Sequence, residues 1–94
     1  MRKQRLELIN PLGLHARAAA KLVDVCQGFA SSISLRDPVS DKVVDGKSIM
    51  NLLLLGAPCG TELTVVCEGE DEEAALQAVS ELINAGFYEL DDPA

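Results

Sequence analysis

The sequence is poor in the residues that usually carry catalysis or bind metals. It contains one histidine, three cysteines and no tryptophan. Cys26, Cys59 and Cys67 are widely separated and form no Cys-x-x-Cys pair, so neither a disulfide framework nor a zinc site is predicted. A single histidine also disfavours a histidine-based metal site. We therefore expect free thiols, no bound metal and no cofactor.

Basic residues are absent from the second half of the chain. All eight Lys and Arg lie in the first 47 residues beside five acids, so this half carries +3, whereas the remaining half carries ten acids and −10. A chain with net charge −7 is a poor partner for a nucleic-acid backbone. The sequence has no apolar run of about 18 residues, the length of a membrane-spanning helix. Glu7, Asn10 and Pro11 interrupt the apolar stretch that a signal peptide would need. We therefore expect a cytoplasmic protein that binds neither nucleic acid nor membrane.

The hydropathy pattern predicts one small α+β domain. A chain of 94 residues, 48% of them hydrophobic, has room for one compact core. Alternating or apolar segments predict strands, helical periodicity predicts helices, and residues 37–41 predict a hairpin turn. The expected strands are 5–10, 32–36, 42–45 and 62–68. The expected helices are 16–27, 49–55 and one that follows the acids at 71–73 and is ended by residues 84–86. The order βαββαβα indicates helices covering one face of an at least partly antiparallel sheet. We place the domain at residues 1–88 and a short acidic tail, fraying past Tyr88, at 89–94.

The only histidine lies at the start of the first predicted helix. His15 follows Gly13 and Leu14, and Arg17 comes two residues later. A helix start presents backbone N–H groups and the positive end of the helix dipole, which together bind anions such as phosphate. The Arg17 guanidinium adds donors that suit phosphate oxygens, and positive surroundings favour a neutral, nucleophilic imidazole. This arrangement suits phosphoryl transfer, although a lone histidine at a helix start is also compatible with a cap or a solvated residue.

The second predicted helix is apolar on nearly every side. Ser48 is placed to cap it, and Asn51 is the only polar residue between 49 and 55. If Leu52 and Leu55 face the sheet, an apolar patch remains, made of Ile49, Met50, Leu53 and Leu54. Exposed patches of this kind mark interfaces, unless loops or the tail cover them.

Three segments resemble the HPr phosphocarriers of the bacterial phosphotransferase system. They are GLHARAAAKLV at 13–23, GKSIM at 46–50 followed by LGAP and GTE at 55–58 and 60–62, and EGEDEEAAL at 68–76. The resemblance covers residues 4–88. It implies an HPr-like open-faced β-sandwich, in which three helices cover one face of a four-stranded antiparallel sheet.

The resemblance also implies a function. His15 would accept a phosphoryl group on Nδ1 from the phosphohistidine of Enzyme I, which phosphoenolpyruvate has charged, and would pass it to an EIIA-type protein. Arg17 would hold that group together with the backbone of Ala16, Arg17 and Ala18. Such a protein is a monomeric carrier rather than a stand-alone enzyme. The family usually has proline where Ala18 stands, a change that keeps the helix and frees one N–H group.

Partner surfaces and regulation follow from the same resemblance. The serine that Ser48 matches is phosphorylated in many HPr proteins by HPr kinase/phosphorylase. The expected partner surface comprises Leu12, Ala20, Lys21, Asp24, Gln27, Ile49, Met50, Asn51, Leu53 and Leu54. We expect Arg17, Lys21 and Lys47 to gather positive charge where phosphate and partners arrive. The acids of the last strand, last helix and tail should face away from that surface.

The branch of the family is less sharply defined. The segment 82–87 followed by acids resembles the nitrogen-type carriers (NPr), and a sugar-type HPr is the alternative. A third hypothesis is a regulatory module that binds through residues 49–54 without phosphotransfer.

Overall fold

Four strands and three helices alternate along the chain as the hydropathy pattern predicts. The computed structural model describes residues 1–90. Its elements are β1 (Arg2–Glu7), α1 (Ala16–Gln27), β2 (Ser32–Asp37), β3 (Lys42–Asp45), α2 (Ile49–Leu55), β4 (Glu62–Glu68), α3 (Glu72–Asn84) and the short 3-10 turn η1 (Gly86–Tyr88). In this part of the chain, no helix is both long and apolar enough to cross a bilayer.

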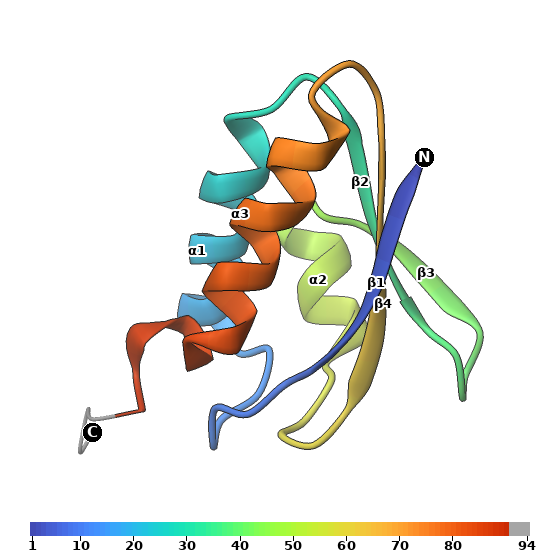
Figure 1. Ribbon diagram of the computed structural model, residues 1–94. Coiled ribbons are helices and arrows are strands. Elements are labelled where there is room, and N and C mark those ends of the chain that lie inside the picture. Colours follow the sequence, from blue (N-terminus) through green and yellow to red (C-terminus); the bar gives the residue numbers. More distant parts are fainter. Residues whose placement is uncertain (91–94) are drawn as a thin grey trace.

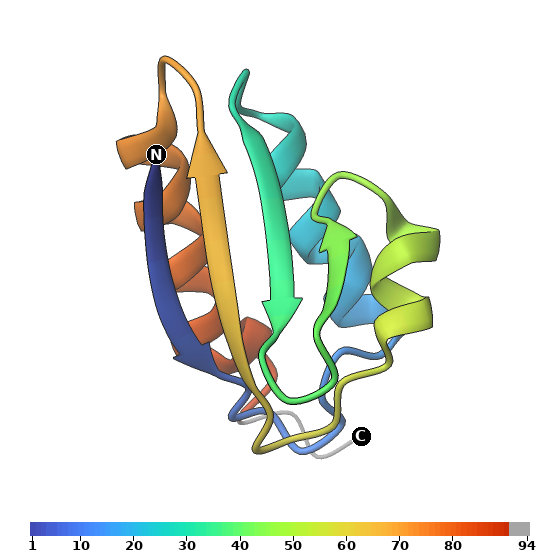
Figure 2. The same cartoon turned by 90° about the vertical axis from the view of Figure 1, so that its right-hand side faces the viewer.

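The sheet has the strand order β1-β4-β2-β3, and every neighbouring pair is antiparallel. All three helices lie on the same side of it, so the opposite face of the sheet is open (Figure 1). Turned by 90°, the molecule shows α3 behind β1 and β4, and α2 beside β3 at the sheet edge (Figure 2). The predicted open-faced β-sandwich is confirmed.

The core forms between the sheet and the apolar stripes of the helices. Leu63, Val65 and Cys67 alternate along β4 and are fully buried. They meet the buried face of α1, which includes Leu22 and Cys26. The apolar side chains of the strands and of the helices thus pack into one core layer between them. This packing fixes the position of α1 on the sheet.

Two boundaries differ from the sequence-based expectation. The first strand runs from Arg2 to Glu7 rather than over 5–10, because pairing with the full length of β4 extends it to Arg2 opposite Cys67. The second difference lies at the C-terminus. Phe87 is fully buried and Glu89 is only 9% exposed, so the chain stays packed on the domain beyond Tyr88. Residues 91–94 of the predicted tail lie outside the described residues.

Candidate functional site at the start of helix α1

A tight loop before α1 fixes the position of His15. Gly13 has φ +61°, and a Cβ there would lie 2.5 Å from the carbonyl oxygen of Ala57. The next residue, Leu14, is buried and donates its N–H to the same carbonyl at 2.9 Å. Only glycine combines that backbone conformation with so close an approach. The loop therefore ties the start of α1 to the segment that follows α2.

His15 is the N-cap of α1, but its side chain does not cap the helix. Its backbone is extended (φ −82°, ψ 180°), its ring makes no capping hydrogen bond, and its carbonyl accepts the N–H of Ala19 at 2.8 Å. The residues between them, Ala16 to Ala18, have no acceptor four residues back within the helix. No acidic residue lies in this first turn. Among residues 1–90, neither a side-chain cap nor a first-turn acid meets the positive end of the helix dipole, which favours an anion.

The three predicted phosphate-binding positions are arranged around this helix start. The side chains of Ala16 and Arg17 are exposed, whereas that of Ala18 is fully buried. Ala18 can therefore contribute only its backbone N–H.

A carboxylate absent from the predicted site faces the histidine ring. Nε2 of His15 lies 2.9 Å from each of the two carboxylate oxygens of Glu89. The His15 side chain is 25% exposed and that of Glu89 is 8% exposed. This contact occupies one ring nitrogen and leaves Nδ1 as the nitrogen that can act as a nucleophile.

Asn10 holds the carboxylate in place. This residue is fully buried, and its Nδ2 donates to Glu89 Oε1 and to the carbonyl oxygen of Gly13, each at 2.6 Å. Burial raises the pKa of Glu89, but the hydrogen bonds from Asn10 and His15 and the nearby charges of His15 and Lys21 outweigh it and hold this pKa below its usual value. Glu89 is therefore an ionised carboxylate at neutral pH.

The chain reaches His15 through an unusual turn after α3. Gly86, Phe87 and Tyr88 have φ values of 63°, 57° and 59°, in the left-handed region that non-glycine residues rarely adopt. The buried Phe87 ring anchors this turn, and Nζ of Lys21 donates to the Phe87 carbonyl at 2.6 Å. Burial of an aromatic side chain offsets the backbone strain, and the next residue, Glu89, is directed at α1.

The expectation that residue 89 begins a frayed tail facing away from the partner surface is therefore wrong for Glu89. The acidic composition predicts fraying past Tyr88, but the buried side chain of Phe87 anchors the chain on the domain and Glu89 stays packed against it. Its signal was present in the sequence, since a large apolar residue follows the Gly86 stop. Asn10 was also missed, because a turn asparagine gives no indication of the carboxylate that it will contact.

The predicted partner surface is exposed around this site. On α1 and in the loop before it, Leu12, Ala20, Asp24 and Gln27 are exposed, and Lys21 is half-buried; on α2, Ile49, Met50, Asn51, Leu53 and Leu54 are exposed. Leu52 and Leu55 are buried as expected. The start of α1 and the end of α2 lie at the same end of the helical layer (Figure 2). The apolar side chains of the α2 patch are thus exposed, and the C-terminal end of α2 lies on the side of the helical layer where α1 begins.

Ser48 closes the start of α2 internally. Its hydroxyl oxygen accepts hydrogen bonds from the backbone N–H and from Nδ2 of Asn51, at 3.3 and 2.8 Å. The helix ends at Gly56, whose φ of 55° is left-handed. The predicted capping role of Ser48 is confirmed.

Lys47 does not belong to the cluster of charges around His15. Its Nζ donates to the carbonyl of Phe29 at 2.7 Å, just beyond the C-terminal end of α1. A helix of twelve residues is about 18 Å long, so Lys47 lies at the far end of α1 from His15. Lys47 was expected near the site because it precedes Ser48, whereas its ammonium binds the carbonyl of Phe29.

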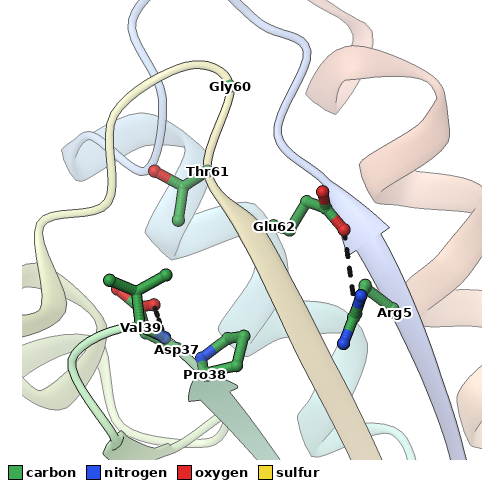
Figure 3. Close-up of a pocket in the computed structure, with 7 residues that line it drawn as sticks. All are labelled: Arg5, Asp37, Pro38, Val39, Gly60, Thr61 and Glu62. Atoms are coloured by element: carbon green, nitrogen blue, oxygen red, sulfur yellow. Dashed lines mark hydrogen bonds and ion pairs between the residues drawn. The ribbon is translucent and has the colours of Figure 1, made fainter.

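The three cysteines and a pocket at this end of the sheet add no group to the contacts of His15. Cys26, Cys59 and Cys67 are free thiols, and burial raises the pKa of Cys26 to about 12. The pocket in Figure 3 lies where β1 and β2 end and β4 begins. Its Arg5 pairs with Glu62 at 3.7 Å, and its Asp37 accepts the N–H of Val39. These charged groups already have partners, and we assign the pocket no ligand.

Comparison with known proteins agrees with this geometry. Residues 2–85 match the family model described as PTS HPr component phosphorylation site. The chain belongs to the HPr family of phosphocarriers. It is 49% identical over 85 residues to the phosphocarrier protein HPr of Pseudomonas aeruginosa, covering 89% of this chain and 92% of that protein. It is 40% identical over 87 residues to the phosphocarrier protein NPr of Escherichia coli K12, covering 93% and 96%.

Solved structures of the HPr family share the fold. A crystal structure of HPr from Thermoanaerobacter tengcongensis superposes with a TM-score of 0.89 at 38% sequence identity, covering 95% of this chain and 98% of that one. The expected fold and family are therefore both confirmed, whereas the choice between the HPr and NPr branches stays open because relatives of both names match.

Proposed function

We propose that His15 carries the phosphoryl group, on Nδ1. The observation that supports this most strongly is the pairing of Nε2 with Glu89, at 2.9 Å, beside a helix start whose N–H groups and dipole favour an anion. Nε2 is occupied, so Nδ1 is the nitrogen left to bond a phosphoryl group at a helix start that favours anions. Arg17, the exposed second residue of α1, supplies a charged donor for the phosphoryl oxygens.

The donor in this proposal is the phosphohistidine of Enzyme I, charged by phosphoenolpyruvate, and the acceptor is a histidine of an EIIA-type protein, all in the cytoplasm. Both would dock on the exposed face made by α1 and by the α2 patch of Ile49, Met50, Leu53 and Leu54. Apolar contact without a deep pocket suits a carrier that must leave one partner to find the next. One copy of the chain carries every part of the site, so the proposal requires only a monomer.

Within the family, we favour the nitrogen-type branch. The residues from Leu82 to Phe87 followed by acids support this placement, and similarity to NPr of Escherichia coli is compatible with it. A sugar-type HPr is the second candidate, favoured by the name of the Pseudomonas aeruginosa relative. Side-by-side phosphorylation by nitrogen-type and sugar-type Enzyme I separates them: faster charging by the sugar-type enzyme would overturn our assignment.

Ser48 is a candidate for regulatory phosphorylation by HPr kinase/phosphorylase. Its hydroxyl already accepts two hydrogen bonds at the start of α2, and a phosphate there would add about two negative charges beside the α2 patch. Treatment with the kinase and ATP, with Ser48→Ala as control, should add one alkali-labile phosphate to the unmodified protein only.

The phosphocarrier role has a direct test. Incubation with phosphoenolpyruvate and Enzyme I should add one acid-labile, alkali-stable phosphate, and His15→Ala should carry none. Phosphate that persists in His15→Ala would contradict the proposed mechanism. If neither protein is labelled by any Enzyme I, the regulatory-module alternative, acting through residues 49–54 alone, is favoured.

A further inference from the structure

We infer that Glu89, held by Asn10, is a positioning residue that selects Nδ1 of His15 as the phosphoryl-bearing nitrogen and stabilises the phosphorylated ring. This inference rests on the proposed phosphocarrier role of His15 and names two residues outside the HPr-like segments quoted above. It concerns the ring orientation and the tautomer, which the helix start alone does not determine.

The geometry places both carboxylate oxygens of Glu89 at 2.9 Å from Nε2. Because an ionised carboxylate only accepts hydrogen bonds, Nε2 must be the protonated nitrogen, and the lone pair of the neutral ring must be on Nδ1. The Asn10 amide, itself fully buried, fixes the carboxylate by donating to Oε1 at 2.6 Å and to Gly13 at 2.6 Å. A hydrogen-bonded partner on one ring nitrogen, itself held in place by a further hydrogen bond, determines which nitrogen of a histidine is available.

The same contact balances the charge of the transfer step. The Nδ1 lone pair forms the new N–P bond while the bond between phosphorus and the donor's histidine nitrogen breaks, and that donor nitrogen keeps the electron pair. Nε2 retains its proton throughout, so the phosphorylated ring of His15 is cationic. Glu89 faces that positive charge, and Lys21, which donates to the Phe87 carbonyl, holds the turn that brings Glu89 there.

The contact between Glu89 and His15 is shielded from water, because the buried Phe87 anchors the chain next to it. Phe87 is 0% exposed and Glu89 is 9% exposed, so the carboxylate is withdrawn from water, where its interaction with a cation is stronger. The charges that lower its pKa are those of His15 and Lys21 on the α1 side. Among the described residues, Glu89 is the carboxylate that contacts Nε2.

The test reads the tautomer of His15 in the unphosphorylated protein by long-range proton–nitrogen NMR, at a pH where the nitrogen shifts themselves show a neutral ring. The wild-type ring should be in the Nε2–H form alone. Glu89→Ala should add a measurable Nδ1–H fraction. Glu89→Gln, which keeps the side-chain volume and can either donate or accept, should give a mixture, and it carries the test if Glu89→Ala does not fold.

A kinetic arm measures the rate of phosphorylation by Enzyme I. Glu89→Ala should lose about tenfold, the effect of one charge-assisted hydrogen bond, and its phosphohistidine should hydrolyse several-fold faster. Glu70→Ala is the matched control, because it removes an exposed carboxylate of the same net charge and should change neither the tautomer nor the rate.

An unchanged tautomer in both Glu89 variants would overturn the inference while leaving the carrier role of His15 intact. Labelling of His15→Ala would overturn the proposed function and leave the tautomer result standing. The two failures are therefore distinguishable.

Discussion

Helices α1 and α2 contribute to the same surface but begin in opposite ways. At the start of α1, the His15 side chain caps nothing and the first turn has no acid. At the start of α2, Ser48 accepts both a backbone and a side-chain donor from Asn51. Within the described residues, α1 therefore has no side-chain cap at its positive end, whereas α2 satisfies its first donors internally.

The two helices differ equally in what they expose. Near His15, α1 presents Arg17, Ala20 and Asp24, whereas α2 presents Met50, Leu53 and other apolar side chains. We interpret this as two separate roles: α1 carries the phosphoryl group, and α2 binds the partner proteins. The link between them is the bond from Leu14 to the carbonyl of Ala57, which keeps the reactive end of α1 near the end of α2.

The largest effect after loss of His15 itself is expected at the open helix. Arg17→Ala should slow phosphorylation by about ten- to a hundredfold, because it removes a charged donor to the phosphoryl oxygens. Enzyme I kinetics with phosphoenolpyruvate measure this. Arg36→Ala, an exposed arginine in the β2–β3 hairpin that pairs with Asp41, is the control and should be unaffected. Equal rates for the two variants would remove Arg17 from the site.

A charge placed in the α2 patch should weaken docking next. Leu53, 40% exposed, can become Glu without entering the core, so Leu53→Glu should raise the Kd for both partners by about tenfold. Calorimetry or surface plasmon resonance measures the affinity, and circular dichroism checks the fold.

The matched control is Val43→Glu, since Val43 is an apolar residue 60% exposed on β3, and strand alternation points it to the sheet face opposite to that of the buried Val44. Equal losses in the two variants would show that charge anywhere on the surface is sufficient. Unfolding of Leu53→Glu would mean that this residue belongs to the core.

Removing the cap of α2 should change stability rather than chemistry. Ser48→Ala should lower the free energy of unfolding by about 1 kcal/mol, measured by urea denaturation, and leave the phosphorylation rate of His15 unchanged. Ser40→Ala, in the exposed hairpin turn, serves as the reference substitution. A Ser48→Ala variant as stable as Ser40→Ala would contradict the capping role.

The smallest effect concerns acid stability. The folded-state pKa of Glu89 lies below its ordinary value of 4.5, so the unfolded chain binds this proton first and folding favours the carboxylate. The stability that Glu89 adds is therefore fully present above about pH 5 and is lost as pH falls through the folded-state pKa. Urea unfolding at several pH values should show wild type and Glu89→Gln converging at low pH. A constant difference between them would contradict this assignment.

Local sequence signals predicted most of the fold and one half of the site. Helical periodicity and Ser48 placed α1 and α2 correctly, because their caps and apolar stripes are encoded within a few residues of each other. Glu89 and Asn10 were not predicted, since their contact joins residues 79 positions apart and depends on a left-handed turn around the buried Phe87. Lys47 was misplaced for the same reason: its acceptor, the carbonyl of Phe29, is close only in the folded chain.

The position of the phosphate on the ring tests the central claim most directly. In the protein phosphorylated by phosphoenolpyruvate and Enzyme I, nitrogen–phosphorus couplings in the NMR spectrum identify the bonded atom. We predict that phosphorus is bonded to Nδ1 of His15, with Nε2 protonated against Glu89. Phosphorus on Nε2, or on a residue other than His15, would contradict the account.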